Sequence, residues 1–401
     1  MIGLSNIHSF IESILSNGRH MKMSYLLSVV IPTKNRIQYL LDCVKTISKI
    51  GSNNIEIVIQ DNSDNQLKVQ SLINEFHNEN IKYYYSAEKL SQTENSDLAL
   101  SHATGDYVTY IGDDDTICEC ILDVVKNMKK YDIDACKYGI TVYNWPDLME
   151  KVPGISSYQS PASMGVLKIL DPKKELIEVL KNGVQSITRL PRVYHGVVSR
   201  RLLQHIYNRI GTYFPGPSPD MANAVACSLF ARNMIDIDIP LIISGYGGSS
   251  AGGLGKRKLH RGSLKGNFQL RDDVEEYWPT KVPKLWMGCT MWPSSAIMSL
   301  KKCKRADLCD IIDYGIIYGE TLLQDRGSLK EIIACSPNTN ETLHALYHIG
   351  SRVANKVFKR SGTVTYCDEL KTPIALEDAV NRQNISNKKF DIDGIFESIY
   401  L

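Results

Sequence analysis

The chain of 401 residues lacks several features that would assign it to a common class of protein. No apolar run reaches the about 20 residues that a membrane-spanning helix needs. The ten cysteines are scattered and form no Cys-x-x-Cys pair, so the spacing typical of a zinc site is absent. Charge is nearly balanced, with 46 basic and 44 acidic residues, which argues against a nucleic-acid partner. What remains is a globular protein with one large or two ordinary domains.

The first segment, residues 1–24, also lacks the basic start and unbroken apolar stretch of a secretory signal peptide. Reduced cysteines in a cytoplasm are therefore the simplest expectation. The segment does place apolar residues at helical spacing, namely Leu4, Ile7, Phe10, Ile11, Ile14 and Leu15. It is predicted to be a helix that packs on the protein. A membrane-surface helix is the alternative, which the scarcity of Lys and Arg on its polar face disfavours.

Strand-like and helix-like segments alternate from residue 26 to residue 130. Apolar runs predict strands at residues 26–31, 55–59, 81–85 and 107–111. Amphipathic patterns predict helices at residues 37–47, 67–76, 98–103 and 117–128. This alternation is typical of an α/β fold with a mostly parallel sheet, which binds ligands at the carboxyl ends of its strands.

Two polar clusters directly follow predicted strands. Asp61-Asn62-Ser63 comes after the second strand, and Gly112-Asp113-Asp114-Asp115 comes after the fourth. Carboxylates this close repel one another and raise their pKa values unless a cation is near. Mg²⁺ or Mn²⁺ suits them, because these ions bind one or two carboxylates together with substrate phosphates. A solvated acidic turn that caps the next helix is the alternative.

The later part of the chain contains fewer strand signals. Residues 151–166 and 211–219 are rich in Pro, Gly or Ser, which predicts loops. Asp220 follows the second loop, where it could cap a helix that runs through residue 231. Residues 172–182 predict a helix, and residues 192–199 and 236–244 predict strands. A glycine-rich, flexible stretch at 245–255 is followed by Lys256-Arg257-Lys258, and residues 265–401 are predicted to be mainly helical.

These motifs together resemble the family 2 glycosyltransferases of the GT-A fold. Residues 28–36 are similar to the opening strand and loop of the family. Residues 58–63 are similar to the segment that carries the family's pair of acidic residues, and Gln60 stands here in place of the first acid. Glu94-Asn95 and residues 103–115 resemble the approach to its metal motif, with Gly112 where a strict Asp-x-Asp would often begin. The similarity is specific over residues 26–130 and weaker to about residue 255.

The resemblance implies a GT-A, Rossmann-like α/β fold, a mixed and mostly parallel sheet flanked by helices, with a mainly helical C-terminal extension. It implies a glycosyltransferase domain over residues 25–260, in which residues 25–145 bind the nucleotide and residues 146–260 the acceptor. The helical segment 1–24 precedes this domain, and the helical region 261–401 follows it. The fuller pattern resembles bacterial enzymes that build O-antigen or capsule chains.

The family's activity implies a metal-dependent, inverting, hexosyltransferase-type enzyme. It would transfer a sugar from a nucleotide sugar, with UDP the commonest nucleotide in the family, to a hydroxyl of a growing glycan. Asp114 and Asp115 are expected to bind Mn²⁺ or Mg²⁺, and Asp220 to act as the general base. The residues expected to contact the nucleotide sugar are Pro32, Thr33, Asn35, Arg36, Asp61, Asn95, Asp113, Lys256 and Arg257.

Simpler roles stay open for several of these residues. Asp220 could be only a helix cap, Asp61 a turn former, and residues 245–261 a linker with a basic patch. His195 is expected to be a packed core residue. The whole chain could instead be a non-catalytic module that binds a sugar nucleotide or glycan. A sugar nucleotidyltransferase is less suited, because residues 32–36 contain no glycine.

The expected partners follow from the same resemblance. They are a nucleotide-sugar donor and a glycan acceptor, which could be lipid-linked. A lipid-linked acceptor would bring a cytoplasmic protein to the inner face of the membrane as a peripheral component. The terminal segments would then serve membrane docking or a homo-oligomer interface.

Overall fold

A computed structural model describes residues 25–148, 156–257, 259, 261–267, 269–358, 366–370 and 374–400. The helix expected within residues 1–24 lies outside the described residues. Within these ranges, no helix combines the length and the apolar character that crossing a membrane requires.

The first half of the chain builds a parallel sheet with helical crossovers. Four parallel strands lie side by side in the order β4, β1, β2, β3, and they span Tyr107–Tyr110, Leu27–Thr33, Ile55–Asp61 and Ile81–Tyr85. The connecting helices are α2 (Ile37–Ser48), α3 (Gln66–Asn74) and α4 (Gln92–Ser101). The α/β alternation predicted from hydrophobic periodicity is therefore confirmed.

The second half of the chain extends this sheet with mixed strands. Its centre is β6 (Ala135–Asn144), which is antiparallel to β9 (Val197–Ser199) and β7 (Ser157–Pro161) and parallel to β10 (Met234–Tyr246). Two short strands, β5 (Thr116–Ile117) and β8 (Leu167–Leu170), pair with β10, and β11 (Tyr366–Leu370) pairs with β7. Because β9 is also antiparallel to β4, it joins the two halves into one mixed sheet.

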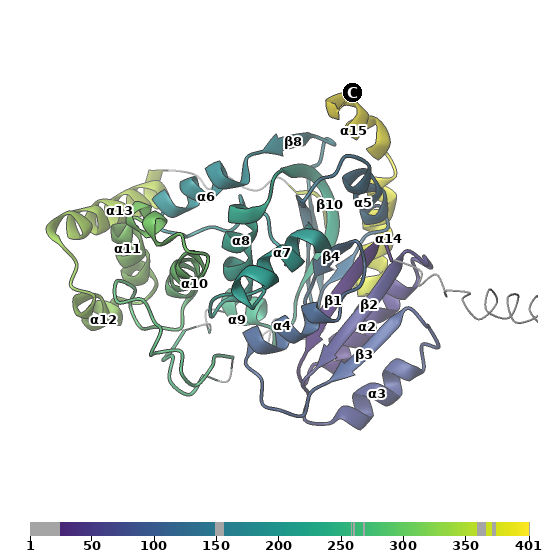
Figure 1. Ribbon diagram of the computed structural model, residues 1–401, viewed down its shortest axis with the longest axis horizontal. Coiled ribbons are helices and arrows are strands. Elements are labelled where there is room, and N and C mark those ends of the chain that lie inside the picture. Colours follow the sequence, from purple (N-terminus) through teal and green to yellow (C-terminus); the bar gives the residue numbers. More distant parts are fainter. Residues whose placement is uncertain are drawn as a thin grey trace, which may run out of the picture.

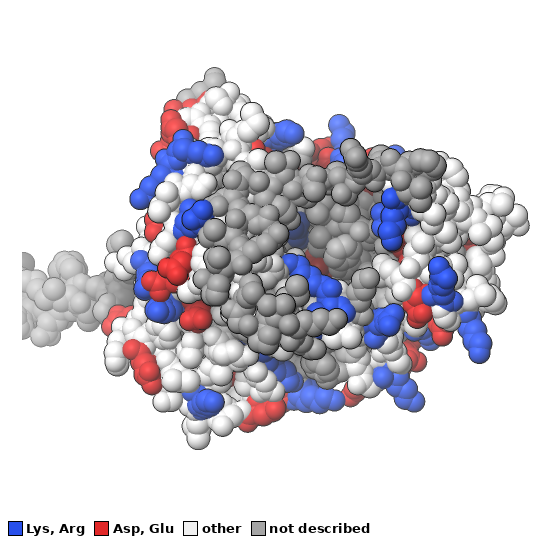
Figure 2. Space-filling model, turned by 180° about the vertical axis from the view of Figure 1, so that it is seen from behind, with Lys and Arg blue, Asp and Glu red and all other residues white. Residues whose placement is uncertain are grey.

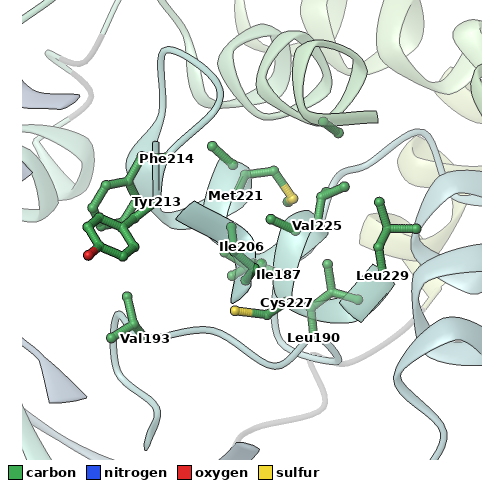
Figure 3. Packing of buried hydrophobic residues seen from close by; sticks show 14 of the residues in the cluster. Ile187, Leu190, Val193, Ile206, Tyr213, Phe214, Met221, Val225, Cys227 and Leu229 are labelled. Carbon is green, nitrogen blue, oxygen red and sulfur yellow. The ribbon is translucent and has the colours of Figure 1, made fainter. Parts of the chain in front are cut away.

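Helices cover both faces of the sheet (Figure 1). The remaining helices of this part are α5 (Ile121–Lys130), α6 (Pro172–Lys181), α7 (Arg200–Ile210), α8 (Pro219–Phe230) and α9 (Ala251–Lys256). Side chains alternate along each strand, so Val30 and Val58 face one core and Ile31 and Ile59 face the other. In Figure 3, Met221, Val225 and Leu229 of α8 lie in the first of these cores.

The C-terminal region is mainly helical, as expected, but it divides between two places. The helices α10 (Gly288–Lys302), α11 (Tyr314–Gln324), α12 (Leu329–Ala334) and α13 (Thr339–Phe358) form a lobe beside α6 and α8 (Figure 1). The helices α14 (Leu376–Asn387) and α15 (Ile392–Tyr400) instead lie next to α2 and α5. Gln383 of α14 is buried and accepts hydrogen bonds from Thr141 and Tyr158 of the sheet, which ties this part to the main core.

Candidate active site

The loops after the first strands are tied together at the carboxyl edge of the sheet. Asn35, with φ at 58°, adopts the left-handed conformation that Asn tolerates better than most residues. Its backbone N–H donates to Ser63 Oγ at 2.7 Å, and its side chain bonds Asp64 in both directions. Asn62 N–H donates to the Thr33 carbonyl at 3.0 Å. Pro32, half-buried near the end of β1, thus leads into a loop of restricted shape.

Asp113 is the first of three consecutive aspartates, Asp113–Asp115, which we call the aspartate run. Its side chain is bonded to the first of these loops. Thr33 Oγ1 donates to Asp113 Oδ2 at 2.6 Å, and Arg36 Nε donates to the same oxygen at 3.1 Å. Arg36 Nη2 lies 2.8 Å from Asp113 Oδ1. Burial raises the pKa of Asp113, and Arg36 opposes this rise. Burial alone would lower the pKa of Arg36, but the charges of Asp113 and Asp114 raise it above its usual value.

Asp115 is held by three partners from separate parts of the chain. Its Oδ1 accepts the Gly245 N–H at 2.7 Å. Its Oδ2 accepts the Gly112 N–H at 2.7 Å and lies 2.8 Å from His195 Nε2. The residue is almost fully buried. Its carboxylate is thus already well bonded within the protein.

Asp114 has fewer hydrogen-bond partners than Asp115. Its Oδ2 accepts the Gly247 N–H at 3.0 Å, and within the described part of the chain no hydrogen bond to Oδ1 is found. A Cβ on Gly112 would lie 2.9 Å from Asp114 Oδ1 and 3.2 Å from Asp115 Oδ2, so glycine is needed for the backbone to pass this close to the two carboxylates. Burial, followed by the charge of Asp115, raises the pKa of Asp114 to about 7.

This arrangement fits a divalent ion of the kind expected. Among the described residues, no group of three or more His, Cys, Asp or Glu side chains converges into a complete metal site. Mg²⁺ commonly takes only one or two carboxylates from a protein and completes its shell with phosphates and water. Asp114, whose Oδ1 has no hydrogen-bond partner among the described residues, could supply one such carboxylate, with Asp115 beside it. Buried carboxylates near one another with a raised pKa are the chemistry that such an ion relieves.

The glycine-rich segment packs against the aspartates, which differs from the flexible stretch expected. A Cβ on Gly245 would lie 1.7 Å from the Asp114 carbonyl oxygen, and one on Gly247 would lie 2.6 Å from Cζ of Tyr39. The backbone can therefore approach closely enough to donate N–H groups to Asp114 and Asp115. Trp145 Nε1 donates to the Asp114 carbonyl at 2.9 Å from the other side.

The two cationic residues that follow this segment contact protein atoms. Lys256 Nζ donates to Asn144 Oδ1 at 2.6 Å and lies 3.4 Å from the centre of the Tyr246 ring. Burial lowers the pKa of Lys256 to about 8. Arg257 Nη2 donates to the Gly248 carbonyl at 2.5 Å. Seen from behind, Lys and Arg lie both near the middle of this face and along its margins, while Asp and Glu lie mainly toward the margins (Figure 2).

Three buried polar residues lie where β2 ends and α4 begins. Asp61 is fully buried, and its oxygens accept the Ser63 N–H at 2.8 Å and the Tyr83 hydroxyl at 2.7 Å. Asn95 and Gln60 are also buried, and each has a side-chain oxygen without a hydrogen-bond partner among the described residues. Such atoms usually bond to protein or water, so these two are candidates for an unseen partner. Gln60 was not singled out from the sequence as a site residue, although it occupies the first position of the family's acidic pair.

Asp220 lies half-buried in the first turn of α8. Its Oδ1 accepts the Met221 N–H at 2.8 Å and the Ser218 hydroxyl, and its Oδ2 accepts Trp292 Nε1 at 3.2 Å. The turn before β9 links helix α8 to the aspartate run, because Val193 N–H donates to Asn223 Oδ1 of α8 at 2.9 Å and His195 Nε2 lies 2.8 Å from Asp115 Oδ2. Burial raises the pKa of Tyr194 in this turn well above its usual value, and the charges of Asp115, Asp114 and Asp220 raise it further. The start of α8, with Asp220, and the aspartate run therefore lie on either side of one turn.

A tight turn places His195 beside Asp115, which sequence reasoning missed. The turn follows a bridge between Tyr110 and Tyr194 and precedes β9. His195 has a positive φ of 53°, and a Cβ on Gly196 would lie 2.2 Å from the Arg192 carbonyl oxygen. Tyr194 stacks on the imidazole at 3.9 Å. His195 is buried, as expected for a core residue, but its ring bonds a carboxylate rather than apolar groups.

Comparison with known proteins agrees with the fold and the motifs. Residues 28–165 match the family described as glycosyl transferase family 2. Glycosyltransferase GlyG of Streptococcus pneumoniae is 28% identical over 116 residues, which are 28% of this chain and 38% of that protein. The GalNAc(5)-diNAcBac-PP-undecaprenol beta-1,3-glucosyltransferase of Campylobacter jejuni is 32% identical over 95 residues, 23% of this chain and 30% of that protein. This chain thus spans about a third of the length of these curated relatives.

Solved structures resemble the chain more loosely. TarS 1–349 of S. aureus in complex with UDP-GlcNAc aligns over 93% of this chain and 90% of its own, with 14% identity and a TM-score of 0.47. The family match covers residues 28–165, which contain the parallel first half of the sheet and the aspartates at its carboxyl edge.

Proposed function

We propose that the chain is a metal-dependent, inverting glycosyltransferase that moves a sugar from a nucleotide sugar to a hydroxyl of a growing glycan. The observation that carries this proposal is the pairing of two features in one region. Asp114 and Asp115 lie side by side at the carboxyl edge of the sheet, and the turn that contains Val193 and His195 bonds both Asp115 and helix α8, whose first turn contains Asp220. A binding module would need the first feature but has no use for a base.

On the donor side, the residues present suit a diphosphate with a divalent ion. Asp114, with Asp115 beside it, would hold Mn²⁺ or Mg²⁺, which neutralises the charge that develops on the leaving diphosphate. The guanidinium of Arg36 is paired with Asp113, and about a quarter of the Arg36 side chain is exposed. It could therefore contact an anion while it stays bonded to Asp113. Lys256 and Arg257 would add positive charge after the glycine-rich segment.

The nucleoside would lie over the loops that Asn35 ties together. Pro32 and Thr33 shape the wall of this pocket, while Asn95 and Gln60 offer amide oxygens that lack a protein partner. We assign Asp61 an indirect part in binding, since it is fully buried and its bonds fix the Ser63 turn and the Tyr83 ring.

On the acceptor side, Asp220 would serve as the general base. The acceptor hydroxyl gives its proton to an oxygen of Asp220 while its own oxygen attacks the anomeric carbon. The bond from that carbon to the diphosphate oxygen breaks on the opposite face, so the configuration inverts. Asp220 is half-buried and its carboxylate is oriented by three donors, which suits a positioned base.

The identities of donor and acceptor rest on the relatives. A UDP sugar is proposed because UDP is common in the family. A lipid-linked glycan, of the kind that builds O-antigen or capsule, is proposed because the Campylobacter relative's name includes an undecaprenol-linked acceptor. This acceptor would place the protein on the cytoplasmic face of the membrane as a peripheral component, and terminal segments would support docking or self-association.

Hydrolysis of a panel of UDP, GDP and dTDP sugars, each with Mn²⁺, Mg²⁺ or chelator, tests the proposal. The wild type should release one nucleoside diphosphate slowly and only with metal. Asp220→Asn should lose this release but keep donor binding by calorimetry. A non-catalytic binding module would bind a donor without turnover in either protein, and a nucleotidyltransferase would release a sugar phosphate instead. The proposal fails if no donor is both bound and turned over.

A further inference from the structure

Asp220 receives a hydrogen bond from Trp292, in helix α10. The indole Nε1 of Trp292 donates to Asp220 Oδ2 at 3.2 Å. Helix α10 lies beside α8 in the helical lobe that follows residue 261 (Figure 1). The family match covers residues 28–165, so both Asp220 and Trp292 lie beyond it.

Helix α10 also holds the loop that leads to Asp220. Ser218 N–H donates to Ser295 Oγ at 2.8 Å. Ser299 Oγ donates to the Pro215 carbonyl at 3.2 Å and to the Ala222 carbonyl at 3.1 Å. A Cβ on Gly216 would lie 2.9 Å from Cα of Ser295, so glycine is needed for this close approach. The loop and the start of α8 are therefore fixed to α10 on both sides of Asp220.

The bonds at Asp220 go beyond what a helix start requires. A carboxylate in the first turn is satisfied locally by Ser218 and by the Met221 N–H, both of which bond Oδ1. Oδ2 receives its donor from a different lobe. An indole N–H can only donate, so it fixes the rotation of the carboxylate. A carboxylate oxygen has two lone pairs, which leaves one direction of Oδ2 for an acceptor hydroxyl.

We propose that Trp292 is a positioning residue for the general base, so that the helical lobe completes the acceptor side of the active site. This inference rests on the proposed function, because it takes Asp220 as the base. Trp292 orients Oδ2 toward the acceptor hydroxyl.

The variant Trp292→Phe tests this role, because phenylalanine keeps an aromatic ring and removes the N–H. Release of nucleoside diphosphate from the donor identified in the sugar-nucleotide panel is measured over a range of donor concentrations. We expect kcat to fall by about tenfold to a hundredfold, as for a lost hydrogen bond to a charged group. Donor KM should stay unchanged, because the lost bond orients the base and not the donor.

Trp278→Phe is the matched control. Trp278 is buried in the same lobe and its Nε1 donates to the Val282 carbonyl at 2.9 Å, so this change also removes an indole hydrogen bond. It should leave kcat unchanged. If Trp292→Phe also leaves kcat unchanged, or if Trp278→Phe lowers kcat equally, the positioning role of Trp292 is wrong, although the proposed glycosyltransferase activity is unaffected. If the wild type turns over no donor, the proposed function fails and this inference fails with it.

Discussion

Replacing Asp114 by Asn is expected to stabilise the metal-free protein and to abolish its response to metal. Burial and the neighbouring Asp115 raise the pKa of Asp114 from 3.8 to about 7. The folded state therefore keeps this proton up to about pH 7, whereas the unfolded chain loses it near pH 4. Between these values the folded state binds more protons, so the free energy of unfolding falls as the pH rises through this window.

The size of the effect follows from the shift. Each unit of pKa difference corresponds to about 1.4 kcal/mol, so a shift of roughly three units limits the effect to about 4 kcal/mol above pH 7. Coupling to Asp113 and Asp115 divides this energy among the cluster, so we expect a gain of about 2 kcal/mol or more for Asp114→Asn at pH 8. At pH 5 the gain should be smaller. The amide oxygen of Asn can still accept the Gly247 N–H.

Urea unfolding at pH 5 and pH 8, with chelator and with Mn²⁺ plus UDP, measures both consequences. The wild type should be stabilised by Mn²⁺ with UDP, and the variant should not be. Asp272→Asn serves as a control, because that side chain is 91% exposed and should change neither stability nor metal response. If Asp114→Asn lowers stability equally at both pH values, the carboxylate is not under electrostatic strain, and the reasoning about the metal position fails.

Three further changes probe the neighbouring contacts. Gly245→Ala should prevent stable folding, because its Cβ would lie 1.7 Å from a backbone oxygen, whereas Gly255→Ala, with nothing within 4 Å, should melt like the wild type in circular dichroism. His195→Asn should weaken Mn²⁺ binding by about tenfold to a hundredfold in calorimetry, because the partner that orients Asp115 is lost. Arg36→Lys should raise donor KM with little change in kcat, since a point charge replaces a guanidinium that contacts both oxygens of Asp113.

Local periodicity predicted the strands and helices up to residue 130 because each of these segments buries a regular pattern of side chains. It missed β6, whose Gly139 interrupts the pattern. The structure shows why glycine is needed there, since a Cβ would lie 2.5 Å from the Asp238 carbonyl oxygen, where β10 bulges. A glycine inside a strand weakens the sequence signal even where the backbone requires it.

The acidic motif was visible in the sequence, but its partners were not. Gly245 and Gly247 lie about 130 residues beyond the aspartates, and His195 lies 80 residues beyond Asp115. The hydrophobic pattern says nothing about which distant N–H groups will meet a carboxylate. The resemblance to a family pointed to a metal motif, yet it could not distinguish three adjacent aspartates by their bonds.

The three aspartates differ in how far hydrogen bonds compensate their negative charges. Asp113 is compensated by Thr33 and the Arg36 cation, and Asp115 by two backbone N–H groups and an imidazole. Asp114 accepts one N–H at its Oδ2, and its Oδ1 lies beside Gly112. Buried charge without compensation is costly, so a cluster of three carboxylates is tolerated only if most of them are bonded. The buried negative charge that is least compensated is therefore that of Asp114, and a cation bound there would offset it.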